Sequence, residues 1–305
     1  MATTDKRLSI TELDFDDIKS NMKIFLKNQT EFTDYDFEGS GMSALLDVLA
    51  YNTHYLSMNA NLLANEMFID TASLRSSVVS HAKTLGDTPR SARAPIATVN
   101  VNVNTSSVNV ATLSRGAKFS TTINDTTYNF VVATDVTKTR VGGSLVFENL
   151  SLYEGTLVTT RYTVDTANVD QRFIISDSNA DTTTLTVKVQ NSASDSTTTT
   201  YTLATDITQV SGTADNYFLQ EVENGQFEVY FGDGVIGKAL SDNNIVILEY
   251  VVTNKEEANG ASTFTAPSSI GESTDNTVST VTNAIGGAES ETIQSIKFNA
   301  PLDYS

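Results

Sequence analysis

The first 88 residues repeat their apolar side chains at helical spacing. A first helix is predicted over 15–27, because its apolar residues fall on one stripe: Phe15, Ile18, Met22, Phe25 and Leu26. Acidic residues 14, 16 and 17 stand at the start of this helix, where the helix dipole favours negative charge. This helix is therefore expected to bury one side and to begin near Asp14.

The second predicted helix, over 42–67, carries a longer pattern. About 26 residues of helix span on the order of 39 Å, which is more than one small domain needs. The spacing of the residues along one side alternates between four and three, as in a heptad repeat. These residues are Met42, Leu46, Leu49, Thr53, Leu56, Ala60, Leu63 and Met67. We call this set the seam.

A third helix is predicted from Asp70, which is a good N-cap residue, to Gly86, after which Pro89 follows. Leu74 and Val78 continue the apolar spacing into this helix. Together with the apolar side chains of the seam, they form the candidate partner interface of the chain.

Two interpretations of the seam remain open. In the first, the helices form a hairpin that packs only on itself. In the second, the seam joins helices of other subunits. The sequence favours the second interpretation, because three helices with so long a stripe lack a fourth helix to cover it.

Near Pro89 the pattern changes to period two. Alternation of apolar and polar residues predicts strands at 97–104, 128–132, 185–189, 227–231 and 245–252, separated by turn-forming residues. Such a series is typical of an antiparallel all-β domain, expected over 89–285. After Gly286 a further helix is predicted over 289–298, as the start of an incomplete domain over 286–305. The fold class is therefore α+β, with a helical region over 1–88.

Composition narrows the function classes. Asp and Glu number 37 against 19 Lys and Arg, which gives a net charge of −18. A negative field repels phosphate backbones, so nucleic acid is not expected as a partner. Cysteine is absent, which removes disulfides and thiolate chemistry. No apolar run approaches ~18 residues, so membrane insertion is not expected either.

One motif resembles a nucleotide-binding loop. Gly232, Gly234 and Gly237 read G-x-G-x-x-G, and Lys238 follows. Phosphate binding at such a loop requires a strand before it and a helix after it. The strand 227–231 is predicted, but no helical spacing follows. The sequence therefore indicates a tight turn between strands, in which glycine supplies positive φ.

Other candidate chemistry is weak. The two histidines, His54 and His81, lie in predicted helices and are assigned structural roles. Residues 177–181 copy half of a calcium loop, but Thr182 stands where glycine is required, and a hairpin turn is expected. Glu221 and Glu223 alternate on one strand, as surface carboxylates often do. We therefore predict no catalytic residue, cofactor or metal site, and no enzymatic activity.

Two blocks together resemble a known family. They are Phe32-Thr33-Asp34-Tyr35-Asp36-Phe37-Glu38-Gly39-Ser40 with Leu46-x-x-Leu49-Ala50-Tyr51-Asn52-Thr53, and Thr71-Ala72-x-Leu74-Arg75-Ser76-Ser77-Val78-Val79. They look like the N-terminal half of baseplate wedge proteins of T-even-type contractile-tailed bacteriophages. Residues 230–234, 259–261 and 113–119 resemble segments of the wider baseplate-J-like family.

The resemblance implies a structural role in the virion, at the tail baseplate, after assembly in the host cytoplasm. Proteins of this family pair with themselves and with another wedge subunit through a helical bundle, and their ring rearranges when the tail sheath contracts. The resemblance also implies contacts with sheath-initiator or tail-tube-proximal proteins. Wedge proteins of this type are longer than 305 residues, and their C-terminal part closes the ring.

Two other functions remain as alternatives. A tail-fibre-like adhesin would use its β domain to bind a glycan or a surface protein, and would show repeats and exposed aromatic loops. A tail-associated hydrolase would need paired carboxylates or a metal cluster in a cleft. Neither pattern is clear in the sequence.

Overall fold

The computed structural model describes residues 14–29, 40–105, 107–168, 170–205, 210–222 and 225–303. The chain divides into two compact units. The first, here the helical unit, joins Met1–Asp87 with Ile293–Ser305, and the second, the β unit, is Thr88–Thr292. Residues 286–305, expected from the sequence to begin a further domain, are divided between these two units. The α+β class is confirmed, with helices before a largely antiparallel β region.

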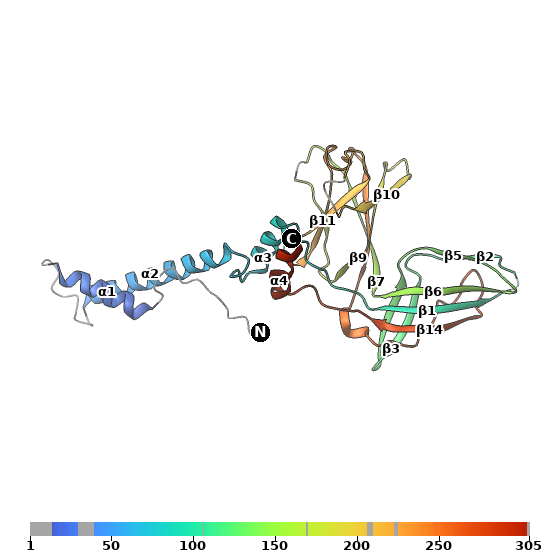
Figure 1. Ribbon diagram of the computed structural model, residues 1–305, viewed down its shortest axis with the longest axis horizontal. Helices are drawn as coiled ribbons and strands as arrows, with labels where there is room; N and C mark the ends of the chain where they lie inside the picture. The colour runs from blue at the N-terminus through green and yellow to red at the C-terminus, as the bar shows by residue number, and fades with distance from the viewer. Residues whose placement is uncertain are drawn as a thin grey trace. The chain divides into compact units, whose positions relative to one another are not determined.

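Helices α1 (Phe15–Lys27) and α2 (Gly41–Glu66) match the first two predicted helices. Figure 1 shows α1 lying along the first half of α2. Asp14 is the N-cap of α1, and its carboxylate accepts the amides of residues 16 and 17 at 2.8 and 3.2 Å. The acidic start of the helix therefore supplies the hydrogen bonds that the first turn lacks.

Helix α3 (Arg75–Thr84) begins later than predicted. Asp70 is not its N-cap, because the amides of Thr71 and Ala72 donate to the carbonyl of Phe68 and form a separate turn there. Leu74 occupies the N-cap position without a side-chain hydrogen bond. The amides of Ser73 and Leu74, just before α3, donate to the carboxylate of a residue of α2 that is described below.

The last helix, α4 (Ile293–Asp303), also begins later than its predicted start at residue 289. It packs on α3 within the helical unit. Lys297 Nζ of α4 donates to the carbonyl of Asp70 at 3.0 Å. Their shared core consists of small and branched side chains: Ala72, Val78, Val79, Ala82, Ile296 and Ala300.

Among the described residues, the strands of the β unit form two large sheets and a two-stranded one. The five-stranded sheet has the order β14-β1-β6-β4-β3. Its strands are β1 (Ile96–Asn104), β3 (Lys118–Ile123), β4 (Thr126–Val132), β6 (Ser144–Glu154) and β14 (Asn276–Ile285), with β2 (Val110–Leu113) and β5 (Val136–Thr139) forming the small sheet beside it. Every second residue of β1 is buried, as the alternation predicts.

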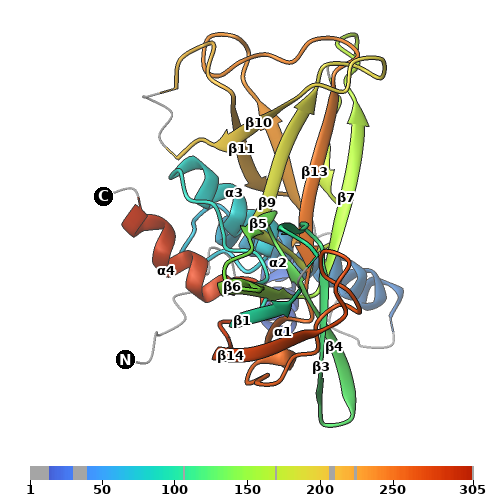
Figure 2. The ribbon, with the colours of Figure 1, turned by 90° about the vertical axis from the view of Figure 1, so that its right-hand side faces the viewer.

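The seven-stranded sheet has the order β7-β13-β9-β10-β11-β12-β8. In Figure 2, β7, β13 and β9 run side by side. The strands are β7 (Thr156–Thr163), β8 (Phe173–Ile175), β9 (Ala180–Gln190), β10 (Thr198–Leu203), β11 (Asn216–Glu221), β12 (Phe227–Phe231) and β13 (Ile245–Val252), and a short 3₁₀ turn, η3 (Lys255–Ala258), follows.

Two details of this sheet differ from the sequence-based expectation. Strands β10 and β11 pair in parallel, whereas the sequence predicts antiparallel strands throughout this domain. The turn at 177–181 joins β8 to β9, which are not neighbours in the sheet. It is therefore a turn but not a hairpin.

Candidate partner interface

Helix α2 is built almost entirely from uncharged residues. Ser40 caps its start by accepting the amide of Ser43 at 3.0 Å, and the helix continues without proline to Glu66. Asp47 and Glu66 are its only acidic residues, and it has no Lys or Arg. No described helix, α2 included, is long and apolar enough to cross a membrane.

The structure divides the seam into a covered and an uncovered part. Leu46 is buried and Met42 is half-buried, whereas Leu49 is 53% exposed and Leu56 is 60% exposed. Leu63 and Met67 are more exposed still, at 66% and 68%. The exposed part begins about one turn after Leu46 and continues to the end of α2.

Helix α1 covers only the first turns of α2. Lys19 pairs with Asp47 across the two helices. Beside this ion pair lies an apolar groove of about 520 Å³. The groove is lined by Ile18, Asn21, Met22, Phe25, Leu26, Leu46 and Leu49. Seam residues therefore form one wall of an open groove, and from Leu49 onward the seam itself is exposed.

The two candidate interface residues of the third predicted helix lie in different surroundings. Val78 is fully buried in the core that α3 shares with α4. Leu74, at the N-cap of α3, is 52% exposed. Val78 is thus covered by the chain itself, and Leu74 is open.

Helix α2 carries a second apolar stripe that the sequence analysis did not separate from the seam. Its members also repeat at alternating intervals of three and four: Val48, Tyr51, Tyr55, Met58 and Leu62. All five are exposed. At 100° per residue, this second stripe lies on nearly the opposite side of the helix from the seam. The signal that reveals it is the same heptad spacing in another register.

The second stripe has a polar element of its own. The rings of Tyr51 and Tyr55 meet edge to face, with centroids 4.7 Å apart. The hydroxyl of Tyr51 donates to that of Tyr55 at 3.0 Å. This hydrogen bond raises the pKa of Tyr51 above its ordinary value. The pair presents two hydroxyls amid apolar side chains, which suits a partner surface with both kinds of group.

The corner between α2 and α3 is held by Glu66. Its carboxylate accepts the amide and the hydroxyl of Ser73 at 2.8 and 2.7 Å, and the amide of Leu74 at 3.3 Å. Burial opposes ionisation of Glu66, but hydrogen bonds from Ser73, Ser77 and Leu74 outweigh it and lower its pKa to about 2. The carboxylate thus caps α3 from the preceding helix.

Both histidines lie in these helices. His81 Nε2 is 2.8 Å from the carbonyl oxygen of Glu66, so it ties α3 to the end of α2. The ring of His54 lies 6.2 Å from that of Tyr55 on α2. The contact of His81 agrees with the structural role predicted for it.

The glycine motif of the β unit is a turn. The amide of Gly234 donates to the carbonyl of Gly237 at 2.9 Å, and a side chain on Gly232 would collide with the carbonyl of Ile236. Residues 232–244, all described, form no helix before β13. The arrangement that cradles a phosphate is therefore missing at this motif.

The remaining chemical candidates form no reactive cluster in the described residues. No group of three or more His, Asp or Glu side chains there is disposed to hold a metal ion. Glu221 is buried at the end of β11, and Glu223 lies outside the described residues. Asp177 accepts the amide of Asn179 at 2.8 Å, as in a turn.

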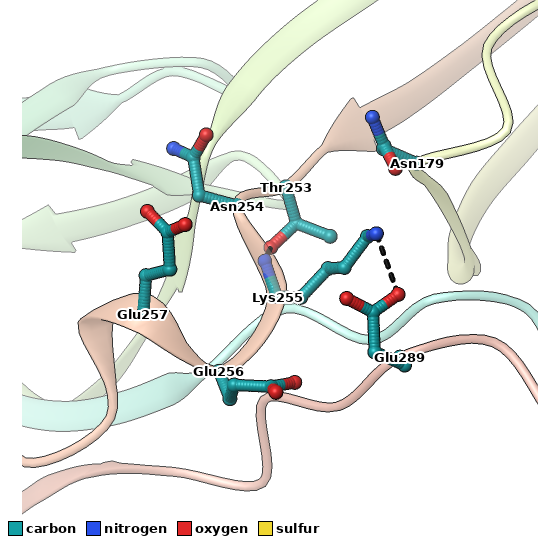
Figure 3. A pocket seen from close by; sticks show the side chains of 7 residues that line it. All are labelled: Asn179, Thr253, Asn254, Lys255, Glu256, Glu257 and Glu289. Carbon is teal, nitrogen blue, oxygen red and sulfur yellow. Dashed lines mark hydrogen bonds and ion pairs between the residues drawn. The ribbon is translucent and has the colours of Figure 1, made fainter.

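A polar pocket of about 230 Å³ lies where η3 approaches the end of the β unit (Figure 3). Its lining includes Lys255, whose ammonium group is paired with Glu289. Glu256 and Glu257 also line it. The one cation of the lining is already neutralised, so the pocket offers no free positive charge to an anionic ligand.

Comparison with known proteins places the exposed helix in a family. Residues 14–87 match the family described as baseplate wedge protein gp6-like, helical domain. The chain is also 33% identical, over 269 residues, to baseplate wedge protein gp6 of Enterobacteria phage T4. The chain is related to the gp6-like baseplate wedge proteins. The resemblance in the sequence is confirmed.

The match with the T4 wedge protein covers 82% of this chain and 40% of its relative. It therefore extends well beyond the helical domain into the β unit. The gp6-like helical domain ends at residue 87, where the helical unit ends along this part of the chain. Of the block 32–40 that carried part of the resemblance, residues 32–39 lie outside the described residues.

Proposed function

We propose that the chain is a structural subunit of a phage tail baseplate wedge, a scaffold rather than an enzyme. Its place would be the virion, after assembly in the host cytoplasm. The observation that supports this most is that α2, which has only two charged residues, exposes the large apolar seam residues from Leu49 to Met67 within a gp6-like helical domain.

We infer that the seam packs against helices of other subunits. Exposed leucines on a helix cost little in an isolated chain, but each one stabilises a complex by about 1.5–3 kcal/mol when fully buried. The exposed seam residues are already half-covered, so their burial contributes on the order of 5 kcal/mol. This is enough to offset a good part of the entropy lost on association.

The second stripe extends the proposal to two neighbours. Because Tyr55 and Met58 lie nearly opposite the seam, one partner helix cannot cover both sides of α2. We propose that α2 stands between two helices in a bundle, one from a second copy of this protein and one from another wedge subunit. Contacts with sheath-initiator or tail-tube-proximal proteins, and rearrangement on contraction, also belong to this proposal.

The test is association of the chain with a co-expressed wedge partner. We expect Leu49→Asp or Leu56→Asp to abolish co-purification, because a carboxylate in the seam would have to be buried without a partner. The circular dichroism of the β unit should stay unchanged. A matched control is Val141→Asp, because Val141 is 80% exposed in the β unit. Co-purification of the seam variants at the level of the control would reject the seam as the interface.

A second pair of variants separates the two sides of α2. Met58→Asp changes the second stripe only, and Leu56→Asp changes the seam only. If α2 has two neighbours, we expect each variant to lose a different one, detected by the composition of the purified complex. Loss of the same partner by both variants would argue for a single neighbour.

A further inference from the structure

The β unit contains two hydrophobic cores that share no residue. The five-stranded sheet, with β2 and β5, encloses one core that includes Phe119, Phe130 and Phe147. The seven-stranded sheet encloses the other, which includes Ile175, Phe227 and Leu248. We call these parts the first and the second lobe. Because each lobe has its own core, a rotation between them need not open either one.

The chain passes from the first lobe to the second at Gly155, between β6 and β7. Gly155 has φ of 123°, a conformation that favours glycine. A side chain here would lie 2.1 Å from the carbonyl oxygen of Val252 on β13. At this junction the backbone of Gly155 therefore packs directly against the backbone of Val252, with no room for a side chain.

Buried polar side chains surround this crossing. Glu154 is fully buried, and its carboxylate accepts the hydroxyl of Thr253 at 2.7 Å and the amide of Asn254 at 2.8 Å. Asp181 of β9 accepts the amide of Ala94 at 2.9 Å, just before β1. The contacts near the crossing are thus directional hydrogen bonds, which hold the two lobes together at the crossing itself.

Arg115 makes a contact between the lobes away from the crossing. It lies in the turn between β2 and β3, where its own amide donates to Asp135 at 2.6 Å. Its guanidinium donates to the hydroxyl of Thr186 at 2.6 Å, to the carbonyl of Thr184 at 2.9 Å and to the carbonyl of Glu249 at 3.0 Å. One side chain of the first lobe therefore holds two strands of the second.

The distance of Arg115 from the crossing makes its contacts sensitive to a rotation between the lobes. Glu249 lies three residues before Val252, the residue that touches Gly155, so the contact is about 10 Å from the crossing. A rotation of about 10° around Gly155 would move the contact by nearly 2 Å, which is enough to break hydrogen bonds of this length. Arg115 is thus sensitive to small changes in the angle between the lobes.

Glu249 does not depend on Arg115 alone. Its carboxylate lies 3.7 Å from Nε of Arg115, an ionic contact too long for a hydrogen bond. The same oxygen is 2.9 Å from Nζ of Lys188, which belongs to the second lobe. If Arg115 leaves, Glu249 keeps a cationic partner, which lowers the cost of release.

We propose that Arg115 is a releasable clamp that fixes the angle between the two lobes, and that Gly155 is the hinge. The clamp is closed in the structure. Its release leaves both cores intact, exposes the guanidinium to water and allows the lobes to rotate as rigid bodies. This inference concerns the β unit alone and does not depend on the packing of α2.

The test measures the distance between the lobes. Because the chain has no cysteine, spin labels can be placed at Thr126→Cys in the first lobe and Ser196→Cys in the second, both at exposed positions. Double electron–electron resonance should give one narrow distance distribution. We expect Arg115→Met to broaden it or to add a second, displaced population, and Arg115→Lys to have an intermediate effect.

The control is Arg172→Met. Arg172 donates to Glu228 at 2.8 Å within the second lobe, so its loss should leave the distribution unchanged. If Arg115→Met does not fold, Thr186→Val tests the proposal in its place, because it removes one hydrogen bond of the clamp. This variant should also broaden the distance distribution. A distribution as narrow as that of the unmodified chain, in the folded Arg115 variant or in Thr186→Val, would overturn the proposal.

Discussion

Strand β1 and helix α2 both carry a regular row of apolar side chains, but only one row is covered. In β1, Ala97, Val99, Val101 and Val103 are fully buried. On the seam of α2, the large apolar residues Leu49, Leu56, Leu63 and Met67 are exposed by half or more. Both rows follow the period of their backbone, two in the strand and about 3.5 in the helix. The difference lies in whether the chain itself supplies the opposite surface.

The two regions are accordingly held in different ways. The β unit is stabilised by its own cores, whereas the helical unit combines the small core between α3 and α4 with polar contacts at the corner of α2. The comparison predicts that truncations to alanine will have unequal effects at the β core, at the corner of α2 and on the seam. These three sites are taken in order of expected effect.

The largest effect is expected in the β unit. Phe119 is fully buried in the core of the first lobe, and Phe119→Ala should cost about 3–5 kcal/mol through lost transfer energy and a cavity. Chemical denaturation followed by the circular dichroism of the strands measures this. A loss below about 1 kcal/mol would mean that the first lobe does not depend on its core.

A smaller effect is expected at the corner of the helical unit. Glu66→Ala should cost about 1 kcal/mol, the usual value of a lost cap, reduced where water screens the carboxylate. Because the pKa of Glu66 is lowered to about 2, its contribution is present above the unfolded value of about 4.3 and lost as the pH falls from there towards 2. Hydrogen exchange of the α3 amides measures both the stability lost in Glu66→Ala and its dependence on pH.

The matched control for this pH dependence is Glu66→Gln, which keeps a hydrogen-bond acceptor without the charge. In this variant, the α3 amides should be less protected from hydrogen exchange at pH 7 than in the unmodified chain. Their protection should also change less between pH 5 and pH 3. The same pH profile in both proteins would assign the dependence to another carboxylate.

The smallest effect is expected on the seam. In the isolated chain, Leu56→Ala should change stability by no more than about 0.5 kcal/mol, because Leu56 is 60% exposed. Leu46→Ala on the same helix should cost about 2 kcal/mol or more, because Leu46 is 4% exposed. Denaturation at a dilution that keeps the chain monomeric compares them. Equal losses would show that the chain covers its own seam.

Much of the fold could be predicted from periodicity. The spacing of apolar residues predicted α1, α2 and the strands β1, β12 and β13 close to their observed bounds. These elements are predictable because the spacing of their apolar residues follows the period of their backbone. The exposed surface of α2 followed from the same spacing, although the second register of Tyr51 and Tyr55 was not separated from the first.

The contacts that were not predicted join residues far apart in sequence or depend on side-chain direction. Glu66 caps α3 across a turn, so the N-cap signal at Asp70 was misleading. The packing of α4 on α3 joins segments separated by the whole β unit, and no local pattern reports such a contact. The contact of Arg115 with Thr186 is likewise visible only in three dimensions.

The closure of α4 over α3 has a consequence for synthesis of the protein on the ribosome. Ile296 and Ala300 complete the core around Val78, yet roughly 200 residues are translated between the two helices, which takes on the order of tens of seconds. During that interval the β unit can fold, while the side of α3 that packs on α4 remains exposed. The core around α3 can therefore be completed only after the β unit has been translated.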